Sequence, residues 1–147
     1  ALGEAGHNLS SEVWWSNTHP FKSSLTGQSA ADLAADFTAK TNRPWTQPIG
    51  FVHSLFEVAS NVMGRVSDVT DADAIAAAIA ATDLDTMVGK VAWNGEGVPD
   101  FAKTNVTKTP LVGGQWRRKE DGTFDLVIVD NQTAPAIPTG GTMEALA

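Results

Sequence analysis

The stretch Thr82–Gly97, TDLDTMVGKVAWNGEG, indicates how this chain folds. An alanine-rich segment precedes it, in which Ile75 and Ile79 lie one turn apart and predict a helix over residues 72–81. Within the stretch, Val88–Trp93 alternates in the manner of a short strand, and the glycine-rich run that follows predicts a turn. The order is therefore helix, loop, short strand and glycine turn.

A hairpin is predicted downstream of this stretch. Leu111–Trp116 and Phe124–Val129 are rich in strand-forming residues, and Glu120–Gly122 supplies the turn between them. Trp116 is interpreted as a structural residue of the first of these strands. After Asn131 the prolines and paired glycines disfavour regular structure, so we expect the tail to lie over the surface as an irregular strap.

The N-terminal part begins with a predicted strand over Leu9–Trp15, which ends in large, strand-favouring side chains. The polar segment 17–28 is expected to be an exposed connection. Ser29 and Asp32 then form the sequence pattern of a capping box, in which a hydroxyl and a carboxylate satisfy free backbone N–H groups. We expect a helix from there to about Lys40.

A longer helix is predicted from Pro48, which suits a first helical turn, to Gly64, a natural stop. A second capping box, Thr70–Asp73, opens the alanine-rich helix. The longer helix carries apolar residues at helical spacing, namely Val52, Leu55, Phe56, Ala59, Val62 and Met63. Its broad apolar face needs a sheet to cover it, and the predicted strands are few. We therefore expect this chain, which begins without methionine, to be part of a longer protein with partner elements upstream.

The composition argues against several partners and chemistries. The formal net charge is −7, and so acidic a surface repels nucleic acid and anionic lipid. The absence of cysteine excludes disulfides, thiolate metal sites and cysteine nucleophiles. His7, His19 and His53 have no metal-ligand spacing, so we expect neither a metal nor a cofactor. The sequence has no Gly-x-Ser-x-Gly motif, and we expect binding without catalysis.

Taken together, these segments resemble the branched-chain amino-acid-type solute receptors of ABC transporters, which have the type I periplasmic binding fold. Thr82–Gly97 is similar to that family's "aat-d-d-t-G-v-w-d-G" run. Gly114–Trp116 with Phe124–Val129 is similar to its closing "G-Q-W … G-f-l-V-v-V" hairpin. Val52–Ala59, VHSLFEVA, resembles the family's "Y-D-A-L-x-V-L-A" helix and departs from it in its first three residues.

The resemblance implies an α/β fold that is part of a two-lobed type I periplasmic binding protein. Such a protein has parallel sheets flanked by helices, and this chain is expected to be incomplete without upstream residues. Ligand is trapped in the cleft between the lobes. The implied division is the end of the second lobe (1–15), a hinge crossing (16–20), part of the first lobe (21–102), a second hinge crossing (103–110), and a C-terminal hairpin and tail on the second lobe (111–147).

The implied function is that of a periplasmic or otherwise extracytoplasmic, membrane-associated receptor. We expect it to capture an amino acid, another small carboxylate or an aromatic acid between its lobes for an ABC importer. The implied partners are this small-molecule ligand, the missing N-terminal part of the same receptor and the membrane subunits of the transporter, without nucleic acid. Two alternatives remain open: a cytoplasmic ligand-sensing regulator with the same fold, and an α/β enzyme fragment whose catalytic residues lie upstream.

The candidate ligand-binding residues are Trp15, Trp45, Gln47, Phe51 and His53. Gln47, Phe51 and His53 lie at the start of the longer helix, where free N–H groups favour an anionic ligand. Trp45 is expected to cover an apolar ligand, and Trp15 to lie near the hinge at the cleft edge. Helix capping or core packing also explains each of these residues, and the sequence leaves both explanations open.

Overall fold

The structure is a computed structural model that describes residues 3–103 and 106–146. Residues 104 and 105 of the predicted crossing 103–110 lie outside the described residues, as do residues 1, 2 and 147. The arrangement mixes helices and strands, which confirms the α/β part of the predicted fold class. Its elements are η1 (Gly3–Gly6), β1 (Ser10–Val13), α1 (Ala30–Thr41), α2 (Pro48–Arg65), α3 (Ala72–Ala80), β2 (Asp83–Thr86), β3 (Gly89–Ala92), η2 (Asp100–Ala102), β4 (Val112–Arg118) and β5 (Phe124–Asp130).

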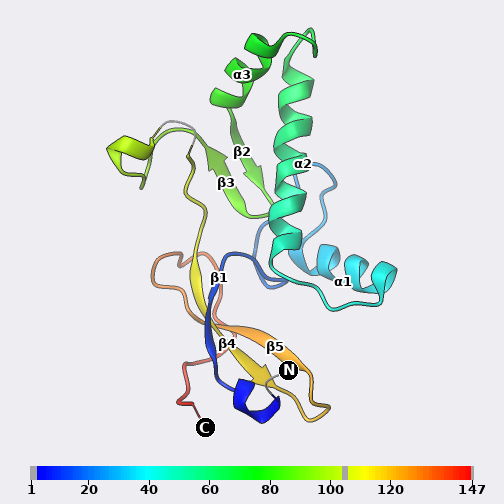
Figure 1. Cartoon of the computed structure of the whole chain (residues 1–147), viewed down its shortest axis with the longest axis vertical. Helices are drawn as coiled ribbons and strands as arrows, with labels where there is room; N and C mark the ends of the chain where they lie inside the picture. The colour runs from blue at the N-terminus through cyan, green and yellow to red at the C-terminus, as the bar shows by residue number, and fades with distance from the viewer. Residues whose placement is uncertain (1–2, 104–105, 147) are drawn as a thin grey trace.

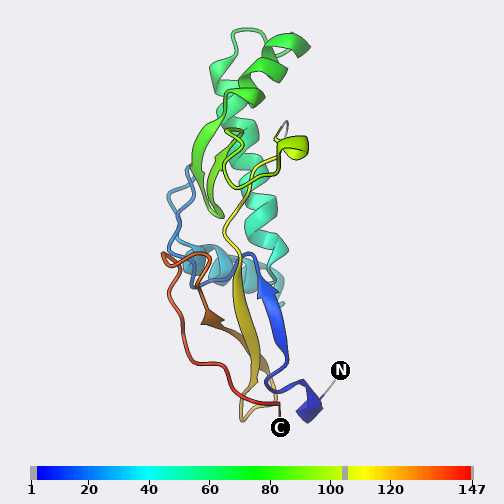
Figure 2. The same cartoon turned by 90° about the vertical axis from the view of Figure 1, so that its left-hand side faces the viewer.

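The molecule is elongated and has a small sheet toward each end (Figures 1 and 2). At one end β2 and β3 form a two-stranded sheet beside α2 and α3. At the other end β1, β4 and β5 form a three-stranded sheet with β4 in the middle, and both termini lie there. The α1 helix lies between these two ends (Figure 1).

Both sheets are antiparallel, whereas the resemblance implied parallel sheets. β2 and β3 are joined by Met87 and Val88 alone, and β4 and β5 by residues 119–123. Connections this short allow only antiparallel pairing. β1 also runs antiparallel to β4, with Val13 opposite Val112. The parallel sheets of the predicted fold class are therefore absent from the described residues.

β2 is a strand that the sequence pattern did not predict. Two of its four residues are aspartates, which are depleted in strands, so its propensity is low. It forms because the Met87–Val88 turn folds it back on β3, with Asp83 opposite Ala92. An ion pair of 2.6 Å between Asp83 and Lys90 adds a contact across the pair.

The two predicted capping boxes have different outcomes. At α1, Ser29 and Asp32 exchange both hydrogen bonds of the predicted box, each at 3.1 Å. At α3 the predicted box Thr70–Asp73 is wrong, because Asp71 is the N-cap residue. The Asp71 carboxylate accepts hydrogen bonds from the backbone N–H groups of Asp73 and Ala74, each at 3.0 Å. A carboxylate at the cap satisfies these donors directly, so the helix needs no reciprocal partner.

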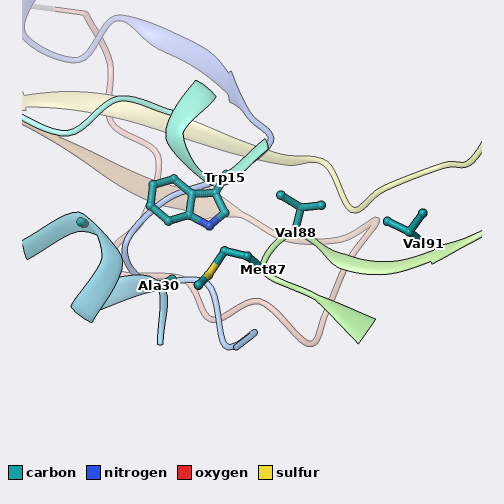
Figure 3. Packing of buried hydrophobic residues seen from close by; sticks show 6 residues of the cluster. Trp15, Ala30, Met87, Val88 and Val91 are labelled. Atoms are coloured by element: carbon teal, nitrogen blue, oxygen red, sulfur yellow. The ribbon is translucent and has the colours of Figure 1, made fainter. Parts of the chain in front are cut away.

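Trp15 is the centre of one hydrophobic cluster (Figure 3). Its side chain is fully buried, and Ala30 of α1 packs around it together with Met87 and Val88 of the β2–β3 turn. α2 approaches the indole so closely at Gly50 that a Cβ there would overlap the ring. Only a glycine fits this contact, so Gly50 sets the distance between α2 and the segment that follows β1.

A second cluster covers one face of the three-stranded sheet. Its buried members are Val13, Val112, Leu126, Ile128 and Ile137. They come from all three strands and from the C-terminal tail, which explains why the tail stays on the sheet without regular structure. Trp45 packs against both clusters and so connects the loop before α2 to the sheet.

Glu57 of α2 is a buried carboxylate that holds two loops on the helix. One of its oxygens accepts hydrogen bonds from the N–H and the hydroxyl of Ser24, at 2.6 and 2.9 Å. The other accepts from the N–H of Met87 at 2.9 Å. Because a buried carboxylate is stable only when such donors satisfy it, these bonds fix the connection 17–28 and the β2–β3 turn relative to α2.

An apolar groove of about 420 Å³ runs along α2. It is lined mainly by Phe51, Leu55, Val58, Ala59, Val62, Met63, Ile75, Ile79, Val88, Val91 and Trp93. Leu55 is 69% exposed and Met63 46% exposed. The β2–β3 sheet thus covers only part of the apolar stripe, as expected for a long helix with too few strands beside it.

The 147-residue chain on its own is expected to self-associate, because the side chains of this groove remain in contact with water. The double substitution Leu55→Gln and Met63→Gln should shift it toward monomer, as measured by light scattering after size-exclusion chromatography. Leu25→Gln, at an apolar residue that is 49% exposed outside the groove, is the matched control and should change nothing. A parent chain that is monomeric and unfolds in one sharp transition would contradict this expectation.

Gly50→Ala in the intact protein should lower the free energy of unfolding by about 2 kcal/mol, because the new methyl group overlaps the Trp15 ring. Gly64→Ala, near the end of the same helix, meets no atom within 4 Å. It should raise the free energy of unfolding by about 0.5–1 kcal/mol through helix propensity. Urea titration measures both. Equal effects of the two substitutions would show that α2 does not depend on its contact with Trp15.

Candidate functional site

A hollow of about 690 Å³ lies between the loop before α2 and the β4–β5 hairpin. We call it the aromatic hollow. It is lined by Trp14, Pro44, Trp45, Thr46, Gln47, Pro48, Trp116, Thr123, Phe124, Asp125 and Leu126. Its size is that of a site for a small organic molecule, and such sites are mostly apolar with a few polar groups. It is therefore the candidate functional site.

Gln47 fixes the loop that forms one wall of the hollow. Its side-chain oxygen accepts from the N–H of Trp14 at 2.8 Å, and its amide nitrogen donates to the carbonyl of Glu12 at 3.1 Å. The amide thus pairs with the backbone edge of β1 as a neighbouring strand would. Pro48 starts α2 immediately afterwards, which limits the conformations of the loop further.

Trp45 forms the boundary between two hollows. Its ring stands edge-on to Trp15, with centroids 5.7 Å apart and planes at 88°. Besides the aromatic hollow, Trp45 lines a second one of about 360 Å³ that Asn17 and Thr18 also line. The side chain is half-buried, so it stays in place while leaving part of its surface accessible.

The opposite wall comes from one face of the β4–β5 hairpin. Trp116 lies directly opposite Leu126, and Phe124 lies two residues before Leu126 on β5. Alternation along the strands therefore places all three on the same face. Trp116 is 36% exposed and lines the hollow, although the sequence pattern suggested a purely structural role. The hairpin register was the signal that could have identified it.

The structure brings only Trp45 and Gln47, among the predicted ligand-binding residues, into the aromatic hollow. Trp15 lies behind Trp45 in the core and is fully buried. Phe51 packs edge-on against Trp14, with centroids 5.2 Å apart, and lines the apolar groove instead. His53 contacts Ser23 in the connection 17–28 and does not line the aromatic hollow. Ligand contact by these last three residues stays a prediction.

His53 and Ser23 close a turn. Nε2 of His53 lies 2.7 Å from the hydroxyl oxygen of Ser23, which also accepts from the N–H groups of Leu25 and Thr26 at 3.1 and 3.0 Å. Two acceptor positions of this hydroxyl are thus occupied, so it donates its own proton to His53. Ser23 is also buried, and the pair serves to fix the loop on α2.

His19, in the predicted crossing 16–20, is a buried and neutral imidazole. The ring Nδ1 of His19 accepts a hydrogen bond from the backbone N–H of Ser16 at 3.1 Å. The backbone N–H of His19 donates to the carbonyl of Ser16, also at 3.1 Å. These contacts make the crossing a closed turn. Burial lowers the pKa of His19 to about 4, because the charged ring would lose its hydration.

Two kinds of structural feature are absent from the described residues. None of their His, Asp and Glu side chains gather in groups of three or more that would suit a metal ion. No helix among them is both long enough and apolar enough to cross a membrane.

No family model and no curated protein sequence matches this chain. Among solved structures, its fold is similar to that of the ABC transporter substrate-binding protein from Sphaerobacter thermophilus, with a TM-score of 0.60 and 14% sequence identity. The similarity covers 88% of this chain, which spans 32% of the length of that protein. Identity this low shows the fold alone: this chain is folded like part of a substrate-binding protein.

Acidification should destabilise the intact protein through His19. Between pH 7 and 5 the unfolded imidazole binds a proton, since its pKa is near 6.5, while the folded one stays neutral with a pKa of about 4. The unfolded state then binds more protons, so the free energy of unfolding falls by about 2 kcal/mol over this window. Urea titrations at both pH values measure the loss. His19→Asn should abolish most of it, and an identical loss in parent and variant would contradict the assignment.

Proposed function

We propose that this chain is part of a solute-binding receptor of an ABC importer and that its ligand binds in the aromatic hollow. The observation that carries the proposal is the position of the hollow. Its walls come from the loop 44–48, which belongs to the proposed first lobe 21–102, and from the hairpin of the proposed second lobe 111–147. A site between two lobes is where closure of the lobes removes a ligand from water.

The grouping of the second lobe is supported by contacts between distant segments. β1 and the β4–β5 hairpin share one sheet. Gln115 donates from its amide nitrogen to the carbonyls of Asn8 at 2.8 Å and of Glu144 at 2.9 Å. Arg117 forms an ion pair with Glu144 at 3.2 Å and donates to the side chain of Asn8. The first and last parts of the chain therefore belong to the same unit.

The first-lobe segment is supported in the same way. α2 contacts both α3 and β2, and Glu57 fixes the β2–β3 turn on it. The proposed crossings 16–20 and 103–110 are the two places where the chain passes between these units, as far as its residues are described. Such short segments absorb the dihedral changes of a hinge motion.

The apolar groove gives the further part of the receptor a place to pack. The similar substrate-binding protein is much longer than this chain, which spans 32% of it. A segment of the same receptor that lies against α2 and α3 would cover Leu55 and Met63 and complete the first lobe. We therefore propose that the expected N-terminal part of the receptor packs into the apolar groove.

In this function the receptor binds its ligand without converting it. Ligand that contacts both lobes shifts the population toward the closed form, which the membrane subunits of the importer distinguish from the open form. The branched-chain amino-acid type and an extracytoplasmic, periplasmic location are the finer parts of the proposal and rest on the sequence resemblance. No catalytic residue and no cofactor takes part in it.

Trp45→Ala and Trp116→Ala in the intact receptor should each weaken ligand binding by roughly 1–3 kcal/mol, because each removes an aromatic wall of the hollow. Phe101→Ala, at an aromatic residue that is 92% exposed and does not line the hollow, is the control. Ligands from a thermal-shift screen of amino acids and small aromatic compounds are titrated by calorimetry and recovered for analysis.

The melting temperature of the ligand-free protein separates binding from packing in this experiment. The proposal expects affinity to fall in both variants and the ligand to be recovered unchanged. The melting temperature should change little in Trp116→Ala and fall in Trp45→Ala, because Trp45 packs against both hydrophobic clusters. Unchanged affinity with a lowered melting temperature would make both tryptophans packing residues. A chemically altered ligand would reveal an enzyme.

A further inference from the structure

The accessible surface of the aromatic hollow is built from rings. Trp14, Trp45, Trp116 and Phe124 come from four different parts of the chain and line the same space. Pro44 adds a further apolar ring at the loop. Trp14, Trp45 and Phe124 are half-buried and Trp116 is more exposed. Phe51 packs edge-on against Trp14 and helps to keep it in place. A flat apolar molecule can stack on such walls with little reorganisation.

Two of the polar side chains that line the hollow, Gln47 and Thr123, are already engaged. Gln47 uses its oxygen on the N–H of Trp14 and its nitrogen on the carbonyl of Glu12. Thr123 donates from its hydroxyl to the carboxylate of Asp121 at 2.6 Å. A ligand that needs several hydrogen bonds would have to displace these contacts, and a buried polar group that loses its partner is costly.

The charge of the lining also disfavours an anion. Among the described residues, Asp125 is the one ionisable side chain that lines the hollow, and it is exposed at the rim. Its carboxylate pairs with Lys119 at 3.3 Å. A ligand carboxylate that entered between the rings would meet no cation of the lining and would approach Asp125. Burial of such a charge without a partner is strongly unfavourable.

We propose that the aromatic hollow selects an uncharged aromatic ring and discriminates against its carboxylate analogue. This inference rests on the proposed receptor function and names its ligand class, which differs from the amino acids, small carboxylates and aromatic acids that the sequence resemblance implied.

The experiment compares matched pairs in which a methyl group replaces a carboxylate. Para-cresol is paired with para-hydroxybenzoate, and skatole with indole carboxylate. Calorimetric titration of the intact protein gives the dissociation constant of each compound. The methyl member of at least one pair should bind about tenfold more tightly than its carboxylate, because only the carboxylate must be buried without a partner.

A substitution that adds a positive charge to the hollow tests separately whether the missing cation causes the discrimination against carboxylates. Thr46→Lys places an ammonium group at the wall of the hollow and should move the preference toward the carboxylate by about tenfold. Ala31→Lys, at an exposed position of α1 outside the hollow, adds the same charge and should leave the preference unchanged.

The outcomes are distinguishable. A carboxylate that binds more tightly than its methyl partner in the parent protein overturns the selection for an uncharged ring and leaves the proposed receptor function intact. Tryptamine that binds more tightly than skatole assigns the site to organic cations and also overturns the inference. If no compound binds in any pair, or if binding is insensitive to Trp45→Ala, the hollow is not the ligand site and the proposed function fails with the inference.

Discussion

The contact between Gly50 and the buried Trp15 ring is the constraint on which the other features depend. Trp15 lies where the chain leaves the three-stranded sheet, and Gly50 lies in the first turn of α2. Because no side chain separates the helix from the ring, the loop before α2 comes within hydrogen-bonding distance of β1. The edge pairing of Gln47, the position of Trp45 and the wall of the aromatic hollow all follow from this approach.

Hydrogen bonds from polar side chains of α2 fix the connection 17–28 and the β2–β3 turn near this contact. Glu57 and His53 lie one turn apart on α2 and hold Ser24 and Ser23, respectively. The other side of the helix carries the apolar groove, whose lining is mostly apolar and includes Ser54. α2 thus has a polar side that orders loops and an apolar side that stays partly exposed.

The sequence predicted the features that local chemistry determines. The Ser29 cap, the start of α2 at Pro48 and the β4–β5 hairpin depend on neighbouring residues, and all are present. The sequence did not predict β2, because its aspartates carry no strand signal. Nor did the sequence predict that β1 pairs antiparallel with β4, since this pairing joins segments far apart in the chain.

The candidate site could be predicted only in part for a related reason. Gln47 and Trp45 follow from their position before α2, whereas Trp116 reaches the hollow through the register of the hairpin. The tryptophan pair after β1 was ambiguous, because alternation in a strand shows that Trp14 and Trp15 point in opposite directions without showing which one is buried. In the structure Trp15 is the buried one, because α2 has a glycine at position 50 and can pack directly against its ring. A sequence pattern does not reveal this contact.

The antiparallel pairing of β1 with β4 has a consequence for the order of folding. Everything between Val13 and Val112 is an insertion between two neighbouring strands of one sheet. During synthesis β1 emerges long before its partner and has no complete sheet to join, while β4 and β5 can pair as soon as their turn is made. The entropy of closing so long a loop falls if the inserted unit has already become compact. Folding of the insertion therefore brings β1 and β4 together, and we expect β1 to join the β4–β5 hairpin late.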